Sequence, residues 1–168
     1  MLEPRFARRP SIAACLFTIA TVDRIGRKPL LLVGSAGMAV TLAVVAWAFS
    51  TAVTDAAGAV SLPGHNGMVA LIAANLYVIF FNASWGPVMW VMLGEMFPNQ
   101  IRGSGLAVSG FAQWIANAAI SVSFPALAVS PGLAVTYFGY AFFAAASFFF
   151  VRKMVNETAG RELEDMAG

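Results

Sequence analysis

The sequence has few charged residues and no marked excess of either sign. Lys and Arg together number 10 and Asp and Glu number 8, so only 11% of the 168 residues are charged and the formal net charge is +2. Nucleic-acid-binding proteins carry clustered positive charge, and this sequence has neither the excess nor the clustering. We therefore expect no nucleic-acid partner.

The side chains that most often carry metal and acid–base chemistry are also scarce. The chain has one cysteine, Cys15, and one histidine, His65. One cysteine cannot form an intrachain disulfide or a thiolate cluster, and one histidine cannot form a multi-histidine metal site. No Ser–His, paired-aspartate or metal-binding constellation is recognisable. We expect no enzyme activity, no catalytic residues, no metal and no cofactor.

Apolar residues make up most of the chain. They account for 60% of the sequence, which lies outside the range of soluble globular domains. Each of four uncharged runs is long enough to cross the roughly 30 Å hydrocarbon core of a bilayer as a helix. They cover about residues 30–50, 68–93, 103–128 and 133–151. The sequence predicts an all-α, polytopic membrane helix bundle whose main environment is the lipid bilayer.

The two ends of the chain differ from these spans. Residues 1–10 form an atypical basic N-terminus, and the apolar run at 11–22 would reach only about 18 Å as a helix, so it is a truncated transmembrane segment. A basic start before a short apolar run also imitates a secretory signal, but no small-residue cleavage site follows. We expect this run to insert poorly or to lie in the interface. Residues 152–168 mix charges of both signs and are expected to form a solvated tail.

The distribution of Lys and Arg among the loops predicts the orientation. The loops that begin at Asp23 and Glu95, and the tail, contain Lys or Arg, whereas the loops that begin at Thr51 and Ser130 contain neither. Positively charged loops remain in the cytoplasm. We therefore expect a multi-pass protein of the cell membrane with a cytoplasmic C-terminus.

Two of the spans contain residues that should alter helix packing. Gly86-Pro87 lies within the span at 68–93, where proline removes a backbone donor and clashes with the preceding turn, so a kink or break is expected. In the span at 30–50, Gly34, Ser35 and Gly37 allow close helix contact in lipid.

Amide and indole side chains form the candidate binding face. Gln113 and Asn117 are four residues apart and share a helix face, with Trp114 beside them. Amides offer both donors and acceptors, which suits neighbouring sugar hydroxyls, and an indole face suits the C–H side of a pyranose. Asn82 and Trp90 lie on the span with the predicted kink. The alternative is structural, since amides also bond across membrane helices and Trp packs there.

Three motifs carry a family resemblance. Residues 84–105 contain Gly-Pro, Trp, Glu, Phe-Pro and Arg at the spacing of the tenth helix and following cytoplasmic loop of the sugar porter family, within the major facilitator superfamily. Weaker matches are Val22-Asp23-Arg24-Ile25-Gly26-Arg27-Lys28-Pro29-Leu30 and Asn156-Glu157-Thr158-Ala159-Gly160. The chain resembles only the last third of a family member. The resemblance implies the C-terminal part of that fold, with residues 23–151 forming the transporter bundle of four full transmembrane helices after a truncated one.

The resemblance also implies roles for individual residues. In the family, sugar is contacted by the Trp four residues after Gly-Pro and by a Gln-Trp pair in the eleventh helix; these positions are Trp90, Gln113 and Trp114 here. Asn82 is a weaker candidate, and Asn117 is as much a structural as a ligand candidate. Charged residues at the cytoplasmic helix ends form ion pairs that hold one conformation of the transport cycle. The matching residues are Asp23, Arg24, Arg27, Glu95, Arg102 and Glu157.

The implied function is transport of a monosaccharide, with or without a coupled proton, as in bacterial sugar–proton symporters. The chain lacks the first half of such a transporter and its seventh helix, so we expect a C-terminal fragment that does not transport alone. The tail departs from the family pattern at Asn156 and Ala159, which weakens its part in the ion-pair network. The alternatives are a non-transporting membrane protein that associates with a separate N-terminal half or another transporter, and an inert remnant.

Overall fold

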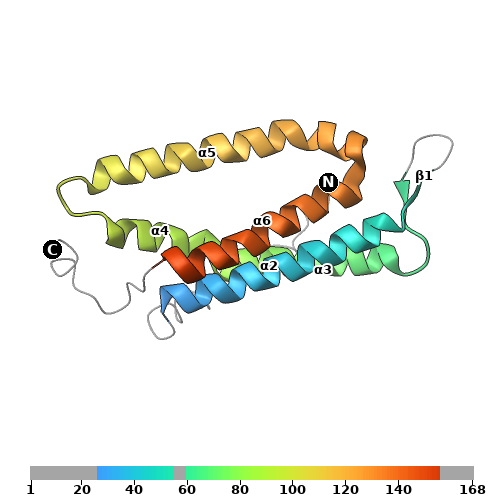
Figure 1. Ribbon diagram of the computed structural model, residues 1–168, viewed down its shortest axis with the longest axis horizontal. Coiled ribbons are helices and arrows are strands. Elements are labelled where there is room, and N and C mark those ends of the chain that lie inside the picture. Colours follow the sequence, from blue (N-terminus) through green and yellow to red (C-terminus); the bar gives the residue numbers. More distant parts are fainter. Residues whose placement is uncertain (1–25, 55–59, 156–168) are drawn as a thin grey trace, which may run out of the picture.

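The computed structural model describes residues 26–54 and 60–155. These residues form helices α2 (Arg27–Ser50), α3 (Asn66–Ala83), α4 (Trp85–Met96), α5 (Arg102–Leu127) and α6 (Leu133–Met154). Strands β1 (Val53–Thr54) and β2 (Val60–Ser61) pair antiparallel, with Val53 opposite Ser61. The helices run along the long axis of the molecule, and α4 continues the direction of α3 (Figure 1).

Four helical stretches are long and apolar enough to cross a membrane. They are Arg27–Ser50, Asn66–Met96, Arg102–Ser130 and Leu133–Met154. The predicted all-α membrane bundle with four full spans is therefore confirmed. The truncated segment at residues 11–22 lies outside the described residues. The short β1–β2 hairpin, in the loop between the first two spans, was not predicted.

The second span is broken at Ser84. This residue has φ −137° and ψ −87°, so α3 ends at Ala83 and α4 begins at Trp85. Pro87 explains the break, because it has no N–H to donate to the carbonyl of Ala83 and its ring would clash with that carbonyl in a continuous helix. The break therefore lies just before the Gly86-Pro87 pair at which the sequence places it.

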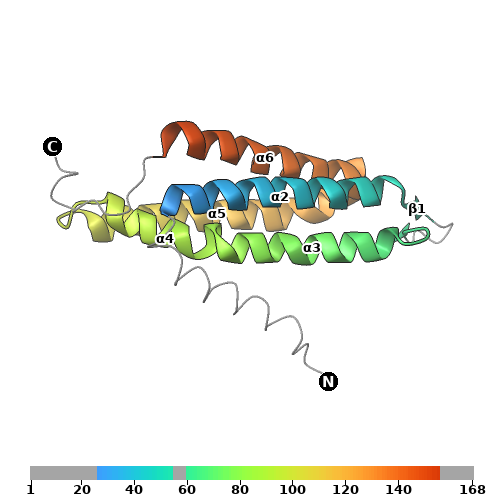
Figure 2. The same ribbon diagram turned by 90° about the horizontal axis from the view of Figure 1, so that it is seen from below.

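Helix α2 is the centre of the bundle, with α6 on one side and α3 on the other (Figure 2). Its glycines permit this packing. A Cβ atom at Gly34 would overlap the Ser84 side chain, and one at Gly37 would overlap the Phe80 ring. The prediction that small residues of this span allow close helix contact is confirmed, and the contact falls where α3 breaks.

A buried serine joins three helices through hydrogen bonds. Ser35 of α2 is fully buried. Trp85 Nε1 of α4 donates to Ser35 Oγ at 2.9 Å, and Ser147 Oγ of α6 lies 3.2 Å from the same oxygen as a further donor. Polar groups inside a membrane protein need such partners because lipid offers none. The network fixes α4 and α6 relative to α2.

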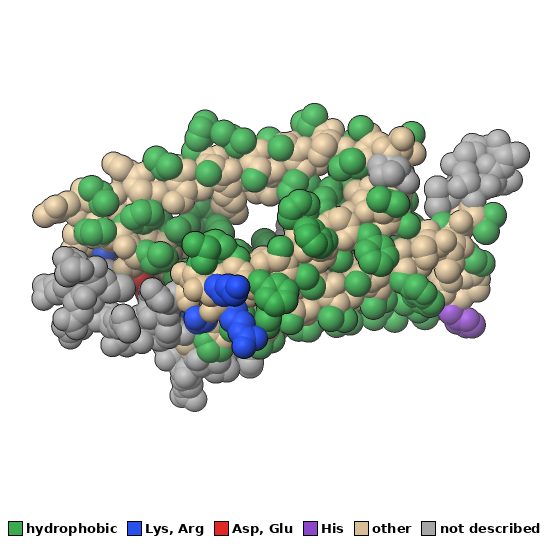
Figure 3. Space-filling model, in the orientation of Figure 1, with side chains coloured by type: hydrophobic (Ala, Val, Ile, Leu, Met, Phe, Trp, Pro, Cys, Tyr) green, Lys and Arg blue, Asp and Glu red, His purple; other side chains and the backbone are tan. Residues whose placement is uncertain are grey.

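Helix α5 stands apart from the other helices and has no buried residue. Figure 1 shows it along one side of the molecule, and Figure 3 shows an opening between it and the rest. At its start, a Cβ atom at Gly105 would come within 2.7 Å of the Phe97 ring. At its end, the Phe124 ring lies 6.3 Å from that of Tyr137 and 6.5 Å from that of Tyr140, measured between centroids. The helix is thus attached mainly near its two ends.

The corner between α5 and α6 is tight. The chain turns at Ser130, whose φ is −145° and ψ is 102°, and Gly132 takes a φ of 102° that favours glycine. Thr136 Oγ1 lies within hydrogen-bond distance of two carbonyls, that of Leu127 at 2.8 Å and that of Gly132 at 2.9 Å. The contact with Leu127 offers a partner to a carbonyl at the end of α5, where the last carbonyls of a helix lack intrahelical donors.

Candidate functional site

The crossing of α4 and α5 brings Trp90 next to the predicted amide face. A Cβ atom at Gly110 would lie 3.5 Å from Trp90 Cη2, so the indole rests against α5 about one turn before Gln113. Gly110 has no side chain to hold the ring away. Trp90 nevertheless remains 41% exposed, so much of its ring is available for a ligand.

Gln113 presents an unpaired acceptor close to this crossing. Its Oε1 atom is shielded from solvent and has no hydrogen-bond partner among the described residues. Leaving a shielded polar atom unpaired is unfavourable, particularly at membrane depth, so the site favours a ligand that can donate. Trp114 is 70% exposed, and Asn117 is exposed one turn further along the Gln113 face. A hydroxyl-rich ligand could donate to Gln113 Oε1 and stack on an indole.

The amides of α3 are bonded differently. Asn82 Nδ2 donates to the carbonyl of Val78, and Asn75 Nδ2 donates to that of Leu71, both at 2.8 Å and both within their own helix. A donor held by the local backbone is less available to a ligand. The structure therefore supports Asn82 less than Gln113 as a sugar-binding residue.

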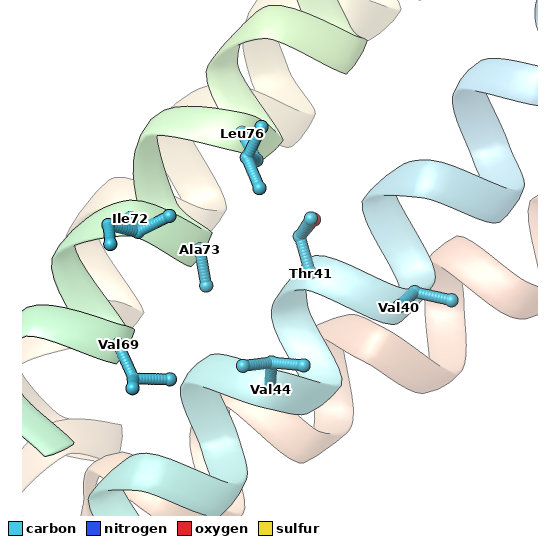
Figure 4. Close-up of a pocket in the computed structure, with 7 residues that line it drawn as sticks. All are labelled: Val40, Thr41, Val44, Val69, Ile72, Ala73 and Leu76. Atoms are coloured by element: carbon cyan, nitrogen blue, oxygen red, sulfur yellow. The ribbon is translucent and has the colours of Figure 1, made fainter.

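An apolar groove between α2 and α3 holds none of the candidate residues (Figure 4). It has a volume of about 250 Å³ and is lined by Val40, Thr41, Val44, Val69, Ile72, Ala73 and Leu76. Its one hydroxyl, on Thr41, donates to the carbonyl of Gly37 at 2.8 Å. The groove has no free polar group to orient a sugar, so we do not assign it to the substrate.

The charged helix ends form a second candidate site, where two of the predicted gate residues make an ion pair. Arg27 Nη2 lies 2.6 Å from Glu95 Oε1, which links the start of α2 to the end of α4. The side chains are 10% and 26% exposed, respectively. Such partial burial strengthens the attraction relative to a pair in open solvent.

The other gate candidates are not brought into this ion pair. Arg102 Nε donates to the carbonyl of Phe97 at 3.4 Å, and its Nη2 atom is buried without a partner among the described residues. Asp23, Arg24 and Glu157 lie outside the described residues. Within the described part of the chain, no group of three or more His, Cys, Asp or Glu side chains could hold a metal ion.

Sequence reasoning gave no role to the network of Ser35, Trp85 and Ser147. Ser35 was expected only to permit close packing, and Trp85 lies within the motif at residues 84–105 but was given no function. Ser35 and Ser147 are 112 positions apart, so no local pattern could pair them. The available signal was that polar hydrogen-bonding groups in uncharged spans need partners.

Comparisons with known proteins agree with these observations. The family model described as "Sugar (and other) transporter" matches residues 11–168. The glucose transport protein of Synechocystis sp. is 49% identical over 156 residues, covering 93% of this chain and 33% of the relative. The D-xylose-proton symporter of Escherichia coli K12 is 38% identical over 157 residues, covering 90% and 30%.

A solved structure supports the fold. The proton:xylose symporter XylE of the major facilitator superfamily, bound to 6-bromo-6-deoxy-D-glucose, matches with a TM-score of 0.81 and 35% identity. The match covers 96% of this chain and 33% of that one. The chain thus spans about a third of the length of the relatives it matches.

Proposed function

Because the chain belongs to the sugar (and other) transporter family of the major facilitator superfamily, we propose that it supplies the C-terminal part of a transporter for a monosaccharide. The transporter would lie in the cell membrane. Relatives named for glucose and for D-xylose support a small neutral sugar as the substrate, and the proton symporters among them support a coupled proton.

The observation that carries the proposal is the unpaired acceptor atom of Gln113, near the contact between α4 and α5. Gln113 Oε1 is shielded without a partner in the described chain, while Trp90 rests against Gly110 one turn away. Gln113 would accept a hydrogen bond from a sugar hydroxyl, and the indoles of Trp90 and Trp114 would stack on its C–H faces. Two further amides would contribute less to sugar binding. Asn117 is exposed, and Asn82 donates to a carbonyl of its own helix.

The charged helix ends would form part of a gate. The Arg27–Glu95 pair joins α2 to α4, so a movement that separates these ends must break a partly buried ion pair. A pair that is present in only one state can bias an equilibrium between states that differ by a few kcal/mol. We propose that Asp23, Arg24, Arg102 and Glu157 act with this pair in the complete transporter.

Transport would require a second half. Transporters of this kind bind substrate between two bundles and move one against the other, which four spans cannot do alone. All five Lys and Arg residues in the described part of the chain lie near the ends of helices at one end of the bundle, which supports a cytoplasmic C-terminus. The other bundle would be the N-terminal half of the transporter.

The test is reconstitution from two chains. This chain would be co-expressed with the N-terminal two thirds of the E. coli D-xylose-proton symporter in cells without their own uptake of xylose and glucose. We expect the two chains to co-purify and to restore uptake of labelled sugar together but not separately. Gln113→Ala should lower uptake about tenfold or more, as loss of one well-placed hydrogen bond to a buried ligand does.

The matched control is Asn75→Ala, because the Asn75 side chain donates to a carbonyl of its own helix and its loss should leave uptake nearly unchanged. Co-purification without sugar binding would instead favour the non-transporting membrane component. Equal uptake by the Gln113→Ala and unsubstituted chains would remove Gln113 from the site.

A further inference from the structure

Helix α4 is short and is not continuous with α3. It has 12 residues, and Ser84 before it has φ −137° and ψ −87°, far from the helical values of about −63° and −42°. Because the helix is interrupted there, α3 does not fix how α4 is turned about its own axis. Side-chain contacts with the neighbouring helices must therefore set that rotation.

One face of α4 packs against α2 and α6. Val88 and Met92 are buried in one apolar cluster with Leu31 of α2 and Val151 of α6, and Trp85 packs against this cluster. Trp85, Val88 and Met92 follow the i, i+3, i+7 spacing of a single helix face. The apolar packing holds α4 against its neighbours, but apolar contact is non-directional and leaves some freedom of rotation.

The hydrogen bond of Trp85 is the directional contact on this face. Trp85 Nε1 donates to Ser35 Oγ at 2.9 Å, and Ser35 is fully buried. Ser147 Oγ of α6 lies 3.2 Å from the same oxygen, so the Ser35 hydroxyl has partners on two helices. Hydrogen bonds require alignment, and no water competes for this one at membrane depth. The bond therefore restricts the rotation that packing alone permits.

Trp90 lies on the other side of α4. It comes five positions after Trp85, which places it roughly 140° further around the helix axis at 3.6 residues per turn. A Cβ atom at Gly110 would lie 3.5 Å from Trp90 Cη2, which is van der Waals contact. A helix with its side chains is about 5–6 Å in radius, so turning α4 by about 20° would move the indole by roughly 2 Å. A shift of that size would take the ring out of its place against α5.

We propose that Trp85 and Ser35 are positioning residues for Trp90. The hydrogen bond between them sets the rotation of α4 and so holds the Trp90 indole where it stacks on the sugar. Binding groups work best when they are held within about 0.5 Å of the productive geometry by side chains behind them. The consequence for sugar rests on the proposed function, whereas the placement of the indole can be measured on this chain alone.

The first measurement follows the Trp90 ring by fluorine NMR. The chain has 4 Trp residues, so 5-fluorotryptophan labelling of the purified full chain in detergent gives one signal for each, and Trp90→Phe identifies that of Trp90. Trp85→Phe removes the N–H donor and keeps an aromatic ring, and Ser35→Ala removes the acceptor. The matched controls are Trp47→Phe, on an exposed part of α2, and Ser123→Ala, on exposed α5.

We expect Trp85→Phe and Ser35→Ala each to shift or split the Trp90 signal, because α4 then takes more than one rotation, and to leave the Trp47 signal in place. Neither control should move the Trp90 signal. The two variants remove opposite members of one bond, so either one that folds provides the test. An unchanged Trp90 signal would overturn the proposal, whatever the sugar affinity does.

The second measurement is the KM for sugar uptake by the two-chain transporter. A hydrogen bond between membrane helices corresponds to about a threefold to thirtyfold change in an equilibrium constant, so Trp85→Phe should raise the KM about threefold to tenfold. A merely structural loss would lower the maximum rate through fewer folded complexes and leave the KM unchanged. In a Trp90→Ala background, Trp85→Phe should cause no further rise in KM, because both changes act through one indole.

The two measurements separate this proposal from that of the sugar site. A shifted Trp90 signal with an unchanged KM would keep Trp85 as the residue that positions Trp90, and would remove Trp90 from the sugar site. A rise in KM that is as large in the Trp90→Ala background would show that Trp85 acts through another group, and would contradict the proposal. A lower maximum rate with an unmoved Trp90 signal would leave the hydrogen bond with a structural role only.

Discussion

Helices α2 and α5 have similar lengths, 24 and 26 residues, and opposite surroundings. Helix α2 buries ten residues between α3 and α6, whereas α5 buries none. Ser35 of α2 is bonded to two other helices, but Gln113 of α5 has an unpaired oxygen. Ser35 of α2 thus bonds within this chain, whereas Gln113 Oε1 of α5 has no partner in the part of the chain that the structure describes.

Glycines show the same difference. Cβ atoms at Gly34 and Gly37 would overlap side chains of α3 or of the break after it, while one at Gly103 would meet nothing within 4 Å. Gly105 and Gly110 of α5 do have close neighbours, which are Phe97, just after the end of α4, and Trp90, in the middle of α4. The comparison can be tested by substitutions that should affect the two helices unequally.

The largest effect is expected for the ion pair at the start of α2. Glu95→Gln leaves the Arg27 guanidinium, only 10% exposed, without its carboxylate. Loss of one member of a buried pair costs about 3 kcal/mol in the free energy of unfolding. The measurement is unfolding in mixed micelles. The coupling is measured with Arg27→Met, Glu95→Met and the double variant. If the double variant lost as much stability as the two single variants added together, the two side chains would not be coupled and the assignment would be wrong.

A smaller loss is expected from Gly34→Ala. The added methyl group would overlap Ser84, and overpacking of this kind typically costs about 1–3 kcal/mol. Gly139→Ala on α6 is the matched control, because a Cβ atom there meets nothing within 4 Å. Both variants would be compared by thermal unfolding in detergent. Equal melting temperatures would contradict the close contact between α2 and the break.

The next smaller loss of stability is expected in the hydrogen-bond network of Ser35, Trp85 and Ser147. Ser35→Ala removes the acceptor of Trp85 Nε1, and hydrogen bonds between membrane helices contribute about 0.6 to 2 kcal/mol. Ser123→Ala on α5 is the control, because its hydroxyl donates to the Ile120 carbonyl of its own exposed helix and not to another helix in the described part of the chain. The two free energies of unfolding should differ by about 1 kcal/mol. A larger loss for Ser123→Ala would reverse the comparison.

The smallest effect on stability is expected at Gln113. Its oxygen has no partner in the described chain, so Gln113→Ala should change the free energy of unfolding by less than about 0.5 kcal/mol. The same substitution is expected to weaken sugar uptake in the two-chain transporter. A loss of stability comparable to that of Ser35→Ala would show that Gln113 is structural.

Much of the fold follows from local features of the sequence. The uncharged runs at 30–50 and 133–151 predicted the bounds of α2 and α6 to within three residues. Helix α2 begins at Arg27 rather than at residue 30, and α6 ends at Met154 rather than at residue 151. Pro87 located the break, and Gly34 and Gly37 indicated close packing. These features depend on residues near one another in the chain.

The candidate site was less predictable, because it depends on which helices meet. Spacing places Gln113, Trp114 and Asn117 on α5, but it does not show that Trp90 rests against Gly110 or that Asn82 bonds its own backbone. Likewise, the charge of Glu95 indicates a pair, and only the structure selects Arg27 as the partner. Contacts between distant positions have no local signature.

The most direct measurement is sugar protection of thiols on the two faces of α5. With Cys15, the only cysteine, replaced by Ser, Ala116→Cys lies near Gln113 and Ala118→Cys lies on the opposite side of the helix. Maleimide labelling of the two-chain transporter would be timed with and without xylose or glucose. We expect sugar to slow labelling at position 116 and not at 118. Equal protection at both positions, or protection at 118 alone, would contradict a sugar site at the α4–α5 crossing.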